Sequence, residues 1–211
     1  TCLQFSSFKI LKYLLDLPFE KPDLNIVINL MNVIEQSCKW GNFPVLRHVL
    51  KNVLITRPFQ GDNINAFHMA CQNGNPEIVK FLSQQSFVNK NCKVMTIIGS
   101  QGWSGLHFAA SKGNTEAVRV LIECKDIEIN CTTSKNQTAI HLACERSITD
   151  TIKILVEHPF SNLAVATNQT NLLALHISCQ RGNSDAVGII LNSNKNYGGI
   201  NALSAGDMTP L

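Results

Sequence analysis

The feature that most constrains this sequence is a short segment that occurs four times with a histidine at the same place. The copies NAFHMACQNG, SGLHFAASKG, TAIHLACERS and LALHISCQRG align without a gap. Their histidines are His68, His107, His141 and His176, which are 39, 34 and 35 residues apart. A period of this length is typical of repeat architectures, in which each unit is one supersecondary element that packs against its neighbours.

Each copy is expected to form two short helices. Apolar residues mark the buried face of both helices in one unit: Leu106, Ala109 and Ala110 in the first, and Ala117, Val118, Val120, Leu121 and Ile122 in the second. Gly113 lies between them, where the chain must turn and a residue that tolerates positive φ is favoured. The pattern predicts a helical hairpin that needs neighbouring copies to bury its apolar face.

The pattern resembles the ankyrin-repeat family, whose unit of about 33 residues opens its first helix with Thr-Pro-Leu-His. Residues 208–211 keep the Thr-Pro-Leu, and Ser104 and Leu173 occupy the Thr position of two copies. Ser104 can accept hydrogen bonds from early helical amides, but Leu173 cannot, so the helix after Leu173 is expected to start less firmly.

The resemblance covers nearly the whole chain. It implies an all-α solenoid of stacked helix-turn-helix units with short β-hairpin or finger loops. It also implies that the recurrent histidines form hydrogen bonds within and between repeats.

We expect residues 1–211 to form one solenoid that is a piece of a longer array. The expected units are 1–24 (partial), 25–60 (degenerate), 61–98, 99–132, 133–167, 168–203 and 204–211 (the start of a further unit). Glu35 replaces the histidine in the degenerate unit. About six residues beyond one family unit separate the first two strong copies, and this surplus predicts a longer finger within 87–101.

Composition and motifs exclude several classes of function. The 18 Lys and Arg residues are scattered and the net charge is only +3, so no basic stripe for a nucleic acid is present. We find no apolar run long enough for a membrane span and no secretory signal, and we expect a cytoplasmic, reducing location. No nucleophile elbow or phosphate-cradling loop occurs, so we expect no enzyme and no cofactor.

The recurrent His-x-x-Cys pattern leaves a metal or redox sensor open as an alternative. It occurs at His68 and Cys71, at His141 and Cys144, and at His176 and Cys179. A closed zinc site needs four ligands that converge on one point, whereas successive pairs here lie a repeat apart. The cysteines are therefore interpreted as small core residues.

The leading hypothesis is a monomeric, non-enzymatic scaffold that binds a protein or peptide on its concave and finger surface. Candidate residues on the inner face are Lys39, Trp40, Gln72, Asn73, Ser111, Lys112, Glu145, Arg146, Gln180 and Arg181. Candidates at the finger tips are Asp62, Asn63, Ile64, Gln101, Trp103, Lys135, Gln137 and Leu172.

Two features of these candidates suggest what kind of partner would bind. Trp40 and Trp103 are expected to face solvent, as interface tryptophans do, although each could instead cover a neighbouring loop. The basic members favour an acidic partner. An organising solenoid without a specific ligand is the other alternative.

Overall fold

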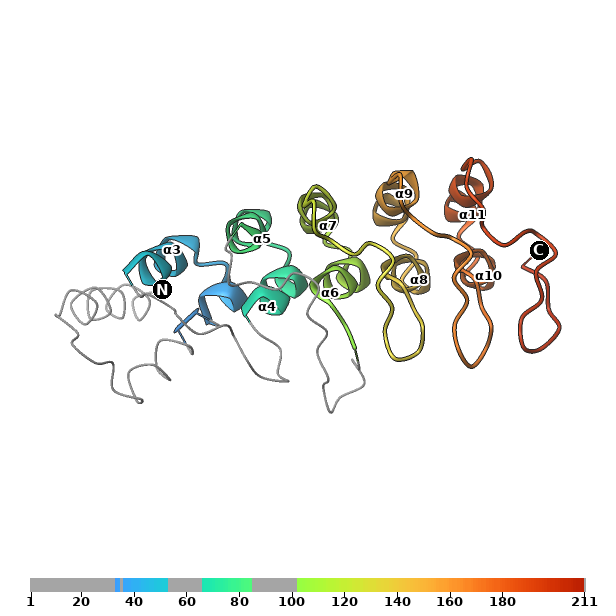
Figure 1. Cartoon of the computed structure of the whole chain (residues 1–211), viewed down its shortest axis with the longest axis horizontal. Helices are drawn as coiled ribbons and strands as arrows, with labels where there is room; N and C mark the ends of the chain where they lie inside the picture. The colour runs from blue at the N-terminus through green and yellow to red at the C-terminus, as the bar shows by residue number, and fades with distance from the viewer. Residues whose placement is uncertain (1–32, 35, 53–65, 85–101, 211) are drawn as a thin grey trace.

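The computed structural model describes residues 33–34, 36–52, 66–84 and 102–210, and these residues form two layers of helices (Figure 1). The inner layer, beside the finger loops, contains α4 (Ala66–Asn73), α6 (Gly105–Lys112), α8 (Ala139–Glu145) and α10 (Ala174–Gln180). The outer layer contains α3 (Phe43–Asn52), α5 (Pro76–Ser83), α7 (Thr115–Ile122), α9 (Thr149–Glu157) and α11 (Ser184–Leu191).

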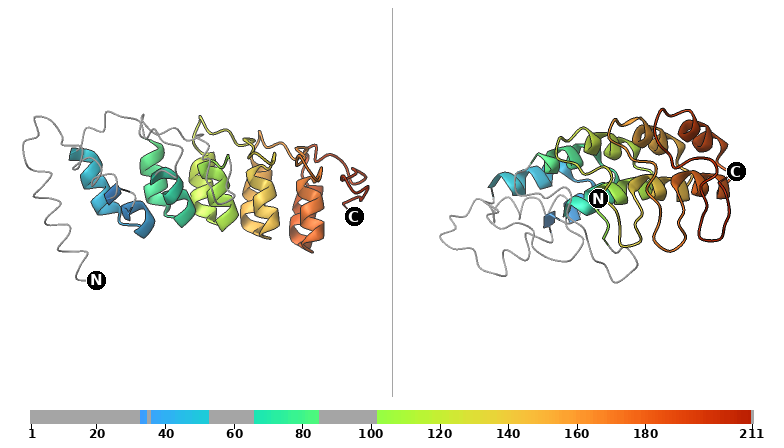
Figure 2. Two further views of the ribbon diagram at one scale, coloured as in Figure 1. Left: turned by 90° about the horizontal axis from the view of Figure 1, so that it is seen from below. Right: turned by 45° about the vertical axis from the view of Figure 1, so that its right-hand side comes forward.

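The helices stack along one axis, which gives the molecule an elongated shape. Each inner helix packs on the next inner helix, and α5, α7, α9 and α11 do the same in the outer layer (Figure 2). Each inner helix also packs on the outer helix that follows it in the chain. This arrangement confirms the predicted all-α solenoid. None of the described helices is long and apolar enough to cross a membrane.

The predicted core faces are confirmed in the unit of α6 and α7. Leu106, Ala109 and Ala110 are buried from α6, and Ala117, Val118 and Leu121 from α7. Val120 and Ile122 are half-buried against the same core. Since these residues contact both their own hairpin and the next one, apolar burial joins the repeats into one continuous core.

Backbone hydrogen bonds close the described finger loops between repeats. Thr133 N donates to Gln137 O at 2.9 Å, and Ser204 N donates to Met208 O at 3.0 Å. Thr167 N donates to Leu172 O at 3.0 Å, so this finger is one residue longer than the other two. Within the described ranges the fingers contain no strand. The expected long finger at 87–101 lies outside the described residues.

The turn inside each hairpin uses a left-handed residue. Gly113 has φ 73°, which confirms the prediction from its position. Ser147 occupies the same place between α8 and α9 with φ 58°. A left-handed conformation costs a non-glycine residue roughly 1–2 kcal/mol, so the second hairpin turn is strained where the first is not.

The recurrent histidine lies in the first turn of each inner helix. Nδ1 of His107, His141 and His176 accepts the backbone N–H of the residue three positions earlier, at 3.1, 3.2 and 3.1 Å. Ser104 is the N-cap of α6, and its hydroxyl lies 2.8 Å from His107 Nδ1. The imidazole bonds the backbone at each of these starts, so α10 starts after Leu173 as α8 does after Thr138, although Leu173 offers no side-chain cap.

The other imidazole nitrogen reaches the next repeat. Because Nδ1 accepts a hydrogen bond, Nε2 carries the proton, and His107 Nε2 donates to Gln137 O at 3.1 Å. His176 Nε2 donates to Ala202 O at 3.0 Å. These contacts confirm, for His107 and His176, the role implied by the resemblance. His141 differs, because its buried Nε2 has no hydrogen-bond partner.

Candidate functional site

Several candidate residues lie at the carboxyl ends of the inner helices, where they form a row along the solenoid. Asn73 and Lys112 end α4 and α6, and Arg146 and Arg181 directly follow α8 and α10; all four side chains are exposed. Cations at a helix carboxyl end also offset its dipole, so a basic residue here has a structural role as well. The row alone does not define a site.

One part of this row is hollowed, and we call it the inner hollow. It has a volume of about 160 Å³ and lies between α6, α8 and the finger that precedes α8. Six of the predicted residues line it, among them Trp103, Lys135, Gln137, Glu145 and Arg146. Ser111, also among the candidates, lines it too. Residues up to 43 positions apart in the sequence therefore share one concave site.

Three lining residues were not among the candidates: Thr133, Ser134 and Leu142. Ser134 precedes Lys135 in the same finger, so a prediction that took whole fingers and not single tips would have found it. Thr133 is buried and closes the finger, since its hydroxyl accepts hydrogen bonds from the amides of Lys135 and Gln137 at 3.3 and 3.2 Å. These bonds hold Lys135 in place.

Trp103 does not face solvent as expected. Its ring is half-buried, with its centroid 5.1 Å from that of Phe108 and 6.4 Å from that of His107. The expectation fails because the ring folds back onto the start of α6 and packs against the core. One edge of the ring still lines the inner hollow, so the tryptophan is a rigid wall of the hollow and not a projecting anchor.

The charges of the inner hollow are unequal. Lys135 and Arg146 are exposed cations on its rim. Its one carboxylate, Glu145, already accepts a hydrogen bond from Gln137 Nε2. The Gln137 backbone carbonyl is in turn fixed by His107 Nε2. The hollow thus presents two cations to a ligand beside a carboxylate that is already hydrogen-bonded.

The other candidates are not brought to the inner hollow. Trp40 is 68% exposed, as expected, and its Nε1 donates to Gln36 Oε1 at 3.0 Å while the Lys39 ammonium lies 5.4 Å from its ring centre. Asp62, Asn63, Ile64 and Gln101 lie outside the described residues. The half-buried Gln72 and Leu172 and the exposed Gln180 are absent from its lining.

Two cysteines of the His-x-x-Cys pattern, Cys71 and Cys144, behave as core residues, and the third, Cys179, is half-buried against the core. Cys71 and Cys144 are fully buried. Burial raises the pKa of the Cys144 thiol to about 12 and that of Cys71 still further, so both stay protonated. Among the residues that the structure describes, no three His, Cys, Asp or Glu side chains gather into a metal site.

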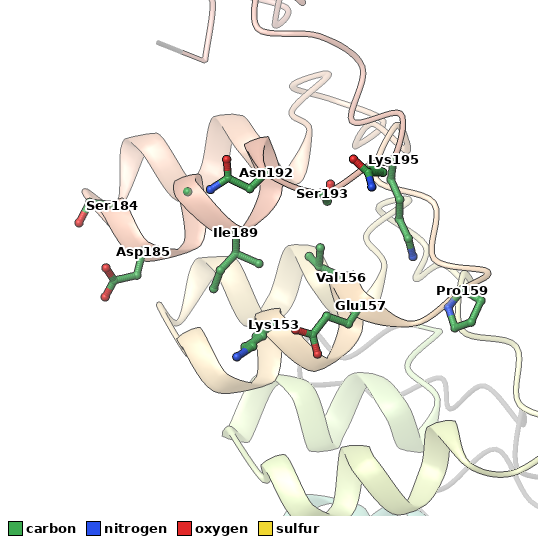
Figure 3. Close-up of a pocket in the computed structure, with 12 residues that line it drawn as sticks. Lys153, Val156, Glu157, Pro159, Ser184, Asp185, Ile189, Asn192, Ser193 and Lys195 are labelled. Carbon is green, nitrogen blue, oxygen red and sulfur yellow. The ribbon is translucent and has the colours of Figure 1, made fainter.

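A second hollow lies on the opposite layer, between α9 and α11, and we call it the outer groove (Figure 3). Its volume is about 880 Å³, and Val156, Pro159 and Ile189 give it apolar walls. Lys195 closes one end, where its ammonium donates a hydrogen bond to the His158 carbonyl. None of its lining residues was predicted as a site.

Known proteins share the sequence pattern behind this architecture. The family described as "Ankyrin repeats (3 copies)" matches residues 4–133 and 106–202. Alpha-latrotoxin-Lg1a of Latrodectus geometricus is 28% identical over 69% of this chain and 10% of its own length. Alpha-latrotoxin-Lt1a of Latrodectus tredecimguttatus is 32% identical over 50% of this chain and 8% of its own length.

A relative of a different kind shares the same repeats. The tyrosine-protein kinase HTK16 of Hydra vulgaris is 26% identical over 63% of this chain and 17% of its own length. The chain thus spans less than a fifth of each of these relatives. Ankyrin repeats are generally protein-interaction modules and are typically non-enzymatic. Since the family matches nearly the whole length, this chain belongs to the ankyrin-repeat family.

Proposed function

We propose that this chain is a non-enzymatic scaffold that binds an acidic segment of a partner protein on its inner surface. The inner hollow is the main contact of this proposal. Its general basis is the interaction role of ankyrin repeats. Its specific basis is the gathering of two cations beside a half-buried tryptophan.

Lys135 and Arg146 are the observation that carries the proposal. They come from different elements, a finger and the end of an inner helix, and meet on the rim of one hollow. Gln137 donates a hydrogen bond to Glu145, which is the carboxylate within the hollow. That carboxylate therefore competes less for the two cations. An Asp or Glu side chain of a partner would complete the charge balance, with Trp103 as the apolar wall beside it.

The proposal includes a monomeric chain in a reducing, cytoplasmic compartment. Its support is the use of cysteine in the core, since Cys71 and Cys144 are buried and keep their protons. Cysteines that fill space between helices suit a compartment where thiols remain reduced.

The test is a fluorescence-anisotropy titration with two labelled peptides. One peptide alternates Glu with Leu, and its neutral match has Gln at every Glu position. We expect the Glu peptide to bind at least tenfold more tightly, and the double variant Lys135→Ala/Arg146→Ala to lose that preference. The matched control Lys80→Ala/Arg119→Ala removes the same charge from the exposed outer face and should leave binding unchanged.

Two outcomes would overturn the proposal. Equal affinity for the Glu and Gln peptides would show that the surface does not prefer an acidic partner. Equal losses in the inner and outer double variants would show that general charge, and not the inner hollow, attracts the peptide. An organising solenoid without a ligand predicts no binding of either peptide.

A further inference from the structure

The outer helices repeat one charge pattern. An acidic residue in the first turn is followed three positions later by a basic residue in α5, α7 and α9: Glu77 and Lys80, Glu116 and Arg119, Asp150 and Lys153. Residues three apart are neighbours on a helix surface, and Arg119 Nε lies 3.6 Å from Glu116 Oε1. Helix α11 breaks the pattern, because Asp185 is followed by Gly188.

Gly188 leaves bare backbone in the wall of the outer groove. A glycine inside a helix is destabilising by roughly 0.5–1 kcal/mol relative to alanine, so it needs a reason. Crowding is not the reason, since a Cβ at this position would meet nothing within 4 Å. The long side chain that the equivalent positions of α5, α7 and α9 carry is missing here, and the space beside the bare backbone is part of the groove.

Asp185 lies in the lining of the same groove, on the first turn of α11 (Figure 3). The positions that could supply an intrahelical base are Gly188 and Ile189, and neither is charged. Lys153 lines the groove from α9, with Asp150 three residues before it and Glu157 four residues after it on the same helix. Lys195 is at the other end and donates to the His158 carbonyl. Asp185 therefore lacks the base on its own helix that its counterparts have three residues later.

We propose that the outer groove binds a lysine or arginine side chain from a partner protein. The aliphatic part of that side chain would lie against Gly188 and Ile189, and its cation would pair with Asp185. This restores, between two molecules, the pair that Glu116 and Arg119 make within α7. Long basic side chains suit such a site because their stems pack on apolar surface while the charged end stays polar.

The apolar walls indicate a polypeptide and not a small free cation. Val156, Pro159 and Ile189 give the residues flanking the basic side chain a surface to cover. The charge preference is opposite to that of the inner hollow, and the two sites lie on different helix layers (Figure 1). The outer site can therefore be tested separately from the proposed function, and failure of one proposal does not imply failure of the other.

The test uses a fluorescein-labelled peptide with the core Leu-Arg-Leu and a matched peptide with citrulline, which has nearly the shape of arginine without the charge. Anisotropy titrations of the whole chain should give at least tenfold tighter binding of the arginine peptide. Asp185→Asn should lower its affinity to that of the citrulline peptide. Gly188→Arg should weaken binding at least tenfold, because it fills the groove from within.

Controls separate the site from folding and from general charge. Gly188→Ala leaves most of the space and should keep binding within threefold of the wild type. Glu116→Gln removes the same charge where a base is already present, and Lys135→Ala/Arg146→Ala alters the inner hollow, so both should bind as the wild type does. Circular dichroism would check the fold of each variant. Equal binding of arginine and citrulline peptides, or full binding by Gly188→Arg with its helices intact, would overturn the proposal.

Discussion

The repeat of α6 and α7 has the same layout as the repeat of α8 and α9. The two repeats differ in the residue at the hairpin turn and in the hydrogen bonds of the histidine. In the first, the hairpin turns at Gly113 and His107 Nε2 bonds to the next finger. In the second, the turn is Ser147 with a positive φ, and the Nε2 of His141 has no partner. Both repeats nevertheless bury the same apolar positions.

Finger length explains why the two histidines differ. His107 faces the finger closed by Thr133 and Gln137, whereas His141 faces the finger from Thr167 to Leu172, which is one residue longer. We attribute the missing bond to this extra residue, while the backbone at Leu172 and Val165 raises the His141 pKa against the larger lowering by burial. Apolar stacking therefore sets the position of the repeats. The length of the finger loop affects whether the histidine Nε2 forms its hydrogen bond to the next repeat.

Apolar stacking is common to both repeats. Truncating a buried apolar side chain should therefore lower the free energy of unfolding by more than any polar difference between the two repeats does. Leu106→Ala should lower the free energy of unfolding by ~2–5 kcal/mol, as for other fully buried leucines. Urea denaturation followed by circular dichroism measures this. Leu203→Ala removes the same atoms from a side chain that is 52% exposed and should change little. Equal midpoints for the two variants would refute the packing.

The buried His141 should make stability depend on pH. Burial lowers its pKa to about 4 from the usual 6.5, so as pH falls the unfolded chain binds the proton first. The stability that depends on a neutral His141 imidazole is fully present above pH 6.5. It is lost as the pH falls from 6.5 to about 4, at about 1.4 kcal/mol per pH unit.

A variant without this imidazole isolates the effect. From pH 7.5 to pH 5 the stability advantage of the wild type over His141→Gln should shrink by about 2 kcal/mol. Denaturant unfolding at the two pH values measures the change. A constant difference between the two proteins would mean that His141 titrates alike in the folded and unfolded chains.

Shortening the longer finger should make the second repeat resemble the first. Deleting the exposed Gln169 should bring a carbonyl within reach of His141 Nε2 and raise stability by about 0.5–1.5 kcal/mol, the worth of one hydrogen bond. The reverse change, one glycine inserted after Lys135, should remove the His107 bond and lower stability similarly. Thermal denaturation of both variants tests finger length directly, and shifts of the same sign would contradict it.

Exchanging the turn residues should give an effect as small as that of finger length. Ser147→Gly removes the cost of a positive φ on a side chain and should stabilise the fold by about 1 kcal/mol. Gly113→Ser should destabilise by somewhat more, because its Cβ would also lie 3.1 Å from Ile148. Chemical denaturation compares the pair. A destabilised Ser147→Gly would show that the serine makes contacts worth more than the strain.

The stacking could be predicted from sequence because it depends on local patterns. The apolar faces of α6 and α7 and the left-handed turn at Gly113 follow from spacing alone. The role of the histidines followed from family resemblance. Their capping action could not be read from residue 104 or 173, because the imidazole supplies the acceptor.

The site could be predicted only in part, because it depends on how loops fold back. Lys135, Glu145 and Arg146 were identified from repeat positions and do lie together. The inward packing of Trp103 depends on its contact with Phe108, which position within a repeat does not reveal. The outer groove had a visible signal, a glycine where the other outer helices carry Lys or Arg, but it appears only when second helices are aligned.

The asparagines of the fingers link each loop to the next. Asn136 Nδ2 donates to Ala166 O at 2.8 Å, and Asn168 donates through N to Lys135 O and through Nδ2 to Ser134 O. The backbone that carries the Lys135 cation is thus tied to a loop that lines none of the inner hollow. A partner that displaces Lys135 must also move Asn168, so hydrogen exchange at the Asn168 amide reports events at a surface the partner never touches.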